Sequence, residues 1–180
     1  MKVETERLLM RLHEPGDADG HLGVTGDPEF RAHFPETYRP TRDKVLFALG
    51  RFVEHWHQFG YGVWCLELKG EAGVLGYCGL RRLPQTEEVE LLYGIRRAYW
   101  GRGLATEAAR AALRFGFEEK GFARVMAVTT PANRPSRRVL EKCGMRYERD
   151  AVYFDMLCAY YAIERGEFRA DASSRYALRD

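Results

Sequence analysis

Residues 99–106, with the sequence YWGRGLAT, contain two glycines directly before a segment with the pattern of a helix. Because glycine has no Cβ atom, Gly101 and Gly103 allow the backbone to approach a ligand closely. The first N–H groups of a helix have no partner within it, so this turn is suited to binding an anion such as a phosphate. Thr106 stands where a GxGxxG dinucleotide motif has its third glycine, and the turn is no GxxxxGK[ST] phosphate loop. A tight strand-to-helix turn without a ligand is the alternative.

A second run, residues 133–144 (NRPSRRVLEKCG), adds to this pattern. With these two runs, the sequence resembles the GNAT superfamily of acyl-CoA-dependent N-acetyltransferases. The other motifs that carry the resemblance are TERLL at 5–9, Asp17, DP at 27–28, VE at 89–90 and ATEA at 105–108, which continues the glycine turn. The RimJ/RimL-like branch is the most similar part of that superfamily. The resemblance spans about residues 5–168. Several motifs in the right order and at compatible spacing are much more specific than any one of them.

The resemblance implies that acetyl-CoA is the cosubstrate. Its pantetheine would lie between two strands that splay apart, residues 89–95 and 123–129, and its pyrophosphate on amides around residues 102–106. The positive end of the following helix would then face the pyrophosphate charge, in agreement with the physical interpretation of the glycine turn. The cofactor-binding residues expected on this basis are Ile95, Arg97, Gly101, Arg102, Gly103, Leu104, Ala105, Thr106, Asn133, Ser136, Arg137 and Arg138.

Acetyl transfer from a thioester to an amine needs a deprotonated nucleophile, a polarised carbonyl and a stabilised leaving group. The resemblance assigns the carbonyl to a backbone N–H near residues 93–95. We expect Glu90 to be the catalytic base, acting through water, because strand alternation places it on the face shared with Leu92 and Gly94. Ser136 is the polar group that the RimJ/RimL-like pattern places at the departing thiolate.

Ordinary structural roles are the alternatives for these residues. Glu90 would then be an exposed strand carboxylate, Ser136 a first-turn helix serine and Asn133 a residue at a helix boundary. Each arginine would lie on a solvated face. Two positions also depart from the family pattern: Ala98 replaces a phosphate-binding Gln or Arg, and Leu140 replaces the tyrosine general acid of other members. The sequence therefore does not identify the general acid.

The predicted reaction is acetyl transfer to a primary amine by direct attack in a ternary complex. At pH 7, deprotonating a lysine costs roughly 4 to 5 kcal/mol, whereas an α-amino group costs about 1 kcal/mol. A protein N-terminal α-amine or a small-molecule amine is therefore the expected acceptor. Five residues of the N-terminal helices would either line the acceptor site or serve only in core or surface packing: Arg31, His33, Phe34, Tyr38 and Trp56. A non-catalytic acyl-CoA-binding sensor or scaffold is the alternative function.

The elements that must position these residues follow from hydrophobic periodicity. Strands are expected at residues 7–13, 61–68, 74–83, 89–95, 123–129, 147–153 and 156–163, the first of them at a sheet edge. Helices are expected after Asp27 and Thr41, the second ending at Gly60, and at 103–120 and 135–142. This order predicts an α+β (mixed α/β) GNAT-like fold, with a mixed, mostly antiparallel sheet of about seven strands flanked by helices. We expect one acyltransferase domain over residues 1–180, with a charged tail at 169–180.

Composition limits the possible partners. Lysine and arginine total 28 against 26 aspartates and glutamates, so the formal charge of +2 indicates neither a nucleic-acid nor a membrane partner. The longest apolar stretch, 156–163, is far shorter than the roughly 20 residues of a membrane span, and no signal peptide is evident. The four cysteines form no CxxC pair, so no metal site is expected. We predict a cytoplasmic protein. The last apolar strand either pairs across a homodimer or occupies an ordinary position in the sheet.

Overall fold

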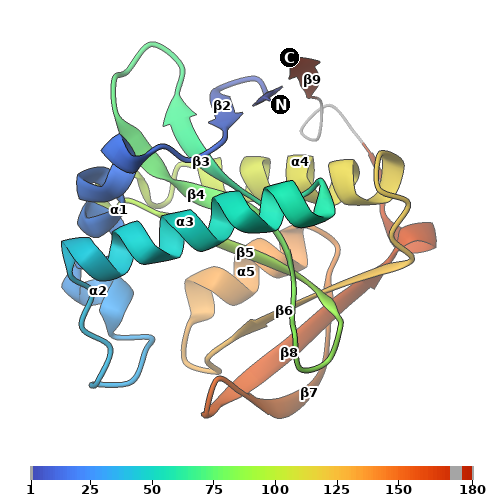
Figure 1. Ribbon diagram of the computed structural model, residues 1–180. Coiled ribbons are helices and arrows are strands. Elements are labelled where there is room, and N and C mark those ends of the chain that lie inside the picture. Colours follow the sequence, from blue (N-terminus) through green and yellow to red (C-terminus); the bar gives the residue numbers. More distant parts are fainter. Residues whose placement is uncertain (1, 171–175, 180) are drawn as a thin grey trace.

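A single nine-stranded sheet runs through the described part of the chain, residues 2–170 and 176–179, in this computed structural model (Figure 1). Its strands are β1 (Lys2–Glu4), β2 (Leu8–Arg11), β3 (Val63–Leu68), β4 (Val74–Arg82), β5 (Val89–Ile95), β6 (Arg124–Thr129), β7 (Arg146–Tyr153), β8 (Met156–Glu164) and β9 (Ala177–Arg179). Their order across the sheet is β7-β8-β6-β5-β4-β3-β2-β1-β9. Every neighbouring pair is antiparallel except β5 with β6. The predicted mixed, mostly antiparallel sheet is confirmed.

Helices cover both faces of this sheet. They are α1 (Ala18–Thr25), α2 (Pro28–Arg31), α3 (Arg42–Phe59), α4 (Leu104–Glu118) and α5 (Arg134–Lys142). Successive side chains of β3 point to opposite faces, and Trp64 packs on Phe115 of α4 while Cys65 lies beside His21 of α1. In Figure 1, α3 accordingly lies in front of the sheet and α4 behind it.

The strands β5 and β6 separate soon after they meet. They share one register pair, Glu90 with Met126, whereas β4 and β5 are paired over the whole length of β5. Beyond Glu90, the amides of β5 that face β6 therefore have no ladder partner in β6. This confirms the splayed strands that the resemblance implied, at residues 89–95 and 123–129.

The helix ends agree with their predicted capping residues. Asp27 Oδ1 accepts hydrogen bonds from the amides of Glu29 and Phe30, at 2.9 and 3.3 Å, and thereby starts α2. Thr41 caps α3 through the amide of Lys44 at 3.3 Å. Gly60 ends α3 in the left-handed conformation, with φ of 67°.

Three features of the sheet and helices differ from the sequence predictions. The first predicted strand, at 7–13, is not at an edge, because β2 lies between β3 and β1. The sheet has nine strands rather than about seven because β1 and β9, of three residues each, are too short to show periodicity. Residues 177–179 of the predicted tail thus form a strand, whereas residues 171–175 and 180 lie outside the described residues.

The helix α1 was missed because it contains glycines that lower helix propensity. A Cβ atom at Gly20 would come within 2.5 Å of the Val74 side chain. The missing side chain therefore allows α1 to approach β4 closely. Tertiary packing, rather than local preference, forms this helix.

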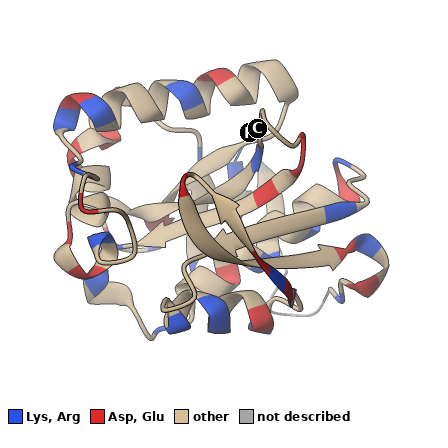
Figure 2. Cartoon of the chain, turned by 90° about the horizontal axis from the view of Figure 1, so that it is seen from below, with Lys and Arg blue, Asp and Glu red and all other residues tan. Residues whose placement is uncertain are grey.

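Charged residues of both signs are interspersed over the elements seen in Figure 2. Neither lysine and arginine nor aspartate and glutamate occupy one whole side of the ribbon in that view. Among the described helices, none combines the length and hydropathy that a bilayer crossing requires.

The core makes a direct stability prediction. Phe115 is 1% exposed and packs between Trp56 and Trp64, with ring centroids 6.2 and 5.1 Å away. Phe115→Ala should lower the free energy of unfolding by about 3–5 kcal/mol in urea denaturation, because it leaves a cavity. The control Phe47→Ala, at a position 74% exposed on α3, should change it by less than about 0.5 kcal/mol. Equal effects of the two substitutions would contradict this packing.

Candidate active site

A cavity of about 740 Å³ opens where β5 and β6 separate. Its walls come from the α2 region, β4, β5, the glycine turn, β6, the start of α5 and the β7–β8 hairpin. It brings together the two sequence runs that were expected to carry the chemistry. The predicted site residues that line it are Glu90, Ile95, Gly101, Gly103, Leu104, Ala105, Thr106, Asn133, Ser136 and Arg138.

The glycine turn adopts the conformation that its residue types suggest. Gly101 and Gly103 have φ of 76° and 78°, in the left-handed region that side chains disfavour. Gly103 is the N-cap of α4, and no side chain caps this end. The amides of residues 104–106 consequently have no partner within the helix, and all three residues line the cavity. Such a helix end can hold a phosphate group.

Hydrogen bonds to the buried carboxylate of Glu107 connect this turn to the N-terminal segment. Glu107 is 8% exposed, and its Oε1 accepts hydrogen bonds from the Thr5 hydroxyl at 2.6 Å and the Arg7 amide at 2.8 Å. Arg7 Nε donates to Glu107 Oε2 at 2.7 Å, and Arg7 Nη1 donates to the Arg102 carbonyl at 2.9 Å. The TERLL motif is thereby tied to the turn. The presence of TERLL in the GNAT-like pattern was the only sequence signal that these residues would support the glycine turn.

The second run supplies the start of α5. Asn133 Oδ1 accepts a hydrogen bond from the Ser136 amide at 3.2 Å, so Asn133 caps this helix. Ser136 Oγ lies 2.9 Å from the Tyr93 hydroxyl, which also donates to the Ser136 carbonyl at 3.0 Å. Burial raises the pKa of Tyr93 above its usual value. The side chain of Tyr93 was missed because an aromatic residue in a strand resembles ordinary core.

Glu90 is the carboxylate that opens onto the cavity. It is 3% exposed, which excludes the exposed-strand alternative. Arg81, its register partner on β4, donates from Nε to Glu90 Oε2 at 2.5 Å. Burial raises the pKa of Glu90 above its ordinary value, and the charge of Arg81 opposes this shift. A carboxylate in this state is a better proton acceptor than an exposed one.

The arginines expected at the cofactor are mostly engaged elsewhere. Arg97 pairs with Glu29 at 2.6 Å, and Arg102 lies over the Tyr99 ring at 5.1 Å. Arg137 Nε donates to the Tyr161 hydroxyl at 2.8 Å. Arg138 lines the cavity, whereas these three do not. Of these four arginines, Arg138 alone therefore lines the cavity together with residues 104–106 at the start of α4.

Aromatic side chains from the α2 region form one wall of the cavity. Phe30, Phe34 and Tyr38 stack in series, with ring centroids 5.2 and 4.8 Å apart. His33, Phe34 and Tyr38 line the cavity as expected. Arg31 and Trp56 do not line it. Trp56 lies in the core, where its Nε1 donates to the Val63 carbonyl at 3.0 Å.

Comparisons with known proteins agree with this geometry. Residues 7–146 match the family described as Acetyltransferase (GNAT) domain. The chain is 36% identical over 160 residues to YkkB of Bacillus subtilis (strain 168), covering 82% of this chain and 87% of that protein. It is 25% identical over 158 residues to the [Ribosomal protein uS5]-alanine N-acetyltransferase of Escherichia coli (strain K12), covering 82% and 79%. The solved structure of Mycobacterium smegmatis RimJ in complex with CoA-disulfide superposes with a TM-score of 0.78 at 20% identity, covering 96% and 91%.

The family match includes the glycine turn, Glu90 and the start of α5, which together form the cavity described above. The sheet with its separating strands has the same fold as RimJ. This chain therefore belongs to the GNAT family of acetyltransferases.

Proposed function

We propose that this protein transfers the acetyl group of acetyl-CoA to a primary amine by direct attack in a ternary complex. One observation carries the proposal: a phosphate-suited helix end and a buried carboxylate open onto the same cavity. GNAT acetyltransferases use acetyl-CoA, which gives the helix end a matching ligand. The pyrophosphate is assigned to the amides of residues 104–106 and the pantetheine to the gap between β5 and β6.

In the proposed reaction, the acceptor nitrogen forms a bond to the thioester carbonyl carbon while the C–S bond breaks. Glu90 takes the amine proton through a water molecule. Arg81 Nε donates a hydrogen bond to Oε2 of Glu90, so we assign the proton to Oε1 of Glu90. An amide of β5 without a ladder partner in β6 polarises the carbonyl oxygen.

The leaving sulfur takes the electron pair of the broken C–S bond. We assign Ser136 Oγ as the hydrogen-bond donor to this thiolate, because Leu140 has no proton to give. Tyr93 holds both the hydroxyl and the carbonyl of Ser136, so it is a positioning residue.

We assign the acceptor to the part of the cavity that Phe30, Phe34 and Tyr38 line. An α-amine fits best, because its lower pKa spares the base most of the deprotonation cost of a lysine. The uS5-alanine N-acetyltransferase relative supports a protein N-terminus, and a small-molecule amine shares the same chemistry. A cytoplasmic location and a homodimer stay predictions.

A non-catalytic sensor of acyl-CoA is the second candidate. Such a protein would keep the glycine turn but would have no use for a buried carboxylate of raised pKa in the cavity. Release of CoA, followed with dithionitrobenzoate, distinguishes the two over a panel of peptides, polyamines and amino sugars. Turnover supports the enzyme, and tight acetyl-CoA binding without turnover on any amine supports the sensor.

Glu90→Gln should lower kcat by about 100-fold or more, the usual contribution of a general base. Because protonated Glu90 cannot accept a proton, the wild-type rate should fall as the pH drops through its raised pKa, and this limb should vanish in the variant. The pH profile of CoA release tests both. Glu54→Gln, at an exposed carboxylate on α3, should leave kcat unchanged. Retention of kcat within about threefold in Glu90→Gln, which is less than a general base contributes, would remove Glu90 from the mechanism.

Ser136→Ala should lower kcat by about tenfold, as expected for the loss of one hydrogen bond to a charged group. Acetyl-CoA affinity should change little, because the thiolate exists only after the C–S bond breaks. Pre-steady-state CoA release measures the chemical step directly. A wild-type rate in the variant would show that another group stabilises the sulfur.

Arg7→Met should weaken acetyl-CoA binding by about tenfold, or about 1.4 kcal/mol, because the turn loses its tie to Glu107 and to the Arg102 carbonyl. The chemical step at saturating cosubstrate should be preserved. Isothermal titration calorimetry gives the affinity. Arg51→Met, at an arginine 65% exposed on α3, is the matched control and should bind normally. Unchanged affinity in Arg7→Met would show that the turn holds its shape alone.

A further inference from the structure

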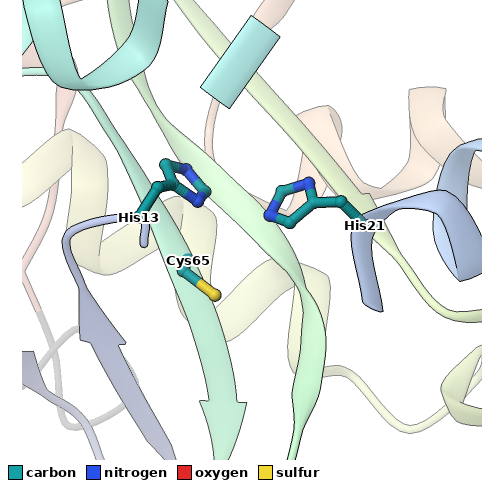
Figure 3. A group of neighbouring side chains, drawn as sticks. All are labelled: His13, His21 and Cys65. Carbon is teal, nitrogen blue, oxygen red and sulfur yellow. The ribbon is translucent and has the colours of Figure 1, made fainter. Parts of the chain in front are cut away.

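Three side chains with metal-ligating atoms meet on the face of the sheet that α1 covers (Figure 3). His13 follows β2, His21 belongs to α1 and Cys65 to β3. Their ligand atoms all lie within 4.8 Å of one another. Figure 3 shows the two imidazole rings side by side, with the sulfur of Cys65 below them in that view; the rings are arranged edge-on, with an interplanar angle of 69°. His13 and His21 lie close to each other in the sequence, whereas Cys65 lies much further along the chain.

The two histidines are buried without the hydrogen bonds that buried polar groups normally make. His13 is 5% and His21 2% exposed, and Cys65 is fully buried. Neither His13 nitrogen, nor Nε2 of His21, has a hydrogen-bond partner among the described residues. Leaving one such atom unsatisfied costs about 1–3 kcal/mol, and native proteins contain few of them. Three in one place point to a ligand that would satisfy them.

The chemical state of the rings suits metal binding. Burial lowers the pKa of His13 to about 3 and that of His21 to about 4, so both imidazoles are neutral near pH 7. Neutral imidazole is the form that coordinates a metal ion. Burial raises the pKa of the Cys65 thiol to about 12, so binding there displaces one proton from sulfur.

The neighbouring charges are already paired and do not add a ligand. Asp17 accepts hydrogen bonds from Arg11 at 2.7 and 2.8 Å and from the Glu14 amide at 2.8 Å. Phe52 lies against His13 and Tyr77 against His21, with ring centroids 5.3 and 5.4 Å apart. The donor set is therefore two nitrogens and one sulfur in mainly aromatic surroundings. Hard cations such as Mg²⁺ and Ca²⁺ need oxygen ligands, whereas Zn²⁺ and Cu⁺ accept imidazole and thiolate.

We propose that His13, His21 and Cys65 form a binding site for one thiophilic d¹⁰ cation, Zn²⁺ or Cu⁺. Ligand atoms around such an ion lie roughly 3.3–3.8 Å apart, so the triad contracts by about 1 Å on binding. The sequence predicted no metal site, since its ligands at positions 13, 21 and 65 share no short motif. The proposal is independent of the acetyl transfer chemistry.

The location gives the ion a structural role at the cavity. Phe52 and Tyr77, which contact the two histidines, also line the wall of the cavity. An ion here would link the end of β2, α1 and β3 behind that wall. It would stabilise the wall without touching Glu90, Ser136 or the glycine turn.

The test uses the full chain after removal of metal with a chelator. Zn²⁺ is titrated in competition with a chromophoric chelator, and Cu⁺ in competition with bathocuproine disulfonate under reducing conditions. One equivalent of either ion should bind, with a rise in thermal midpoint of several degrees, because the ion binds the folded state. Co²⁺ substitution should produce a near-ultraviolet thiolate-to-cobalt charge-transfer band, which reports the sulfur ligand directly.

Variants separate this site from adventitious binding. His21→Ala and Cys65→Ser should each weaken binding at least 100-fold and abolish the cobalt band. His57→Ala, at an exposed histidine, and Cys78→Ser, at a buried cysteine outside the triad, should keep both signals. Circular dichroism and acetyl-CoA binding verify that each variant is folded. Absence of stoichiometric binding by both ions, or binding that survives Cys65→Ser and His21→Ala, would overturn the proposal.

Discussion

The separation of β5 from β6 is the constraint on which the site depends. Two parallel strands in one sheet normally continue their hydrogen-bond ladder, but these two share a single register pair at Glu90 and Met126. Past this point, the backbone groups of β5 that face β6 have no ladder partner there, and a cavity lies in the gap. Glu90 lies at the vertex of this fork. The sheet thus opens the cavity that we propose to hold acetyl-CoA, and it positions the proposed base where the two strands meet.

A second set of interactions fixes the glycine turn before α4. The N-terminus of α4 has amides without a partner in the helix, and it follows two glycines, which can adopt many backbone conformations, so contacts with other segments have to fix the shape of this turn. Glu107 supplies that support, because its carboxylate binds Thr5 and Arg7 while Arg7 also holds the Arg102 carbonyl. Segments 95 to 102 positions apart in the sequence are thereby joined at this turn. This explains in physical terms why the TERLL motif accompanies the glycine turn.

Local patterns predicted the elements well, whereas contacts between distant segments were beyond them. The meander of β3, β4 and β5 and the capped helix α3 followed from periodicity and turn residues. The short helix α1 and the terminal strands β1 and β9 did not, since tertiary packing rather than propensity forms them. The burial of Glu90 against Arg81, the Tyr93–Ser136 contact and the His13, His21 and Cys65 triad each join separate segments. Three of the four arginines predicted at the cofactor contact other side chains. The sequence shows that these residues are charged, but it does not show where their side chains point.

The central claim is that acetyl-CoA occupies the fork, with its pyrophosphate on the amides of residues 104–106. A crystal structure of the protein with CoA tests this most directly. We expect pyrophosphate oxygens within hydrogen-bond distance of those amides, the pantetheine between β5 and β6, and the sulfur beside Ser136. A CoA molecule bound on another face, with the fork closed by side chains, would contradict it.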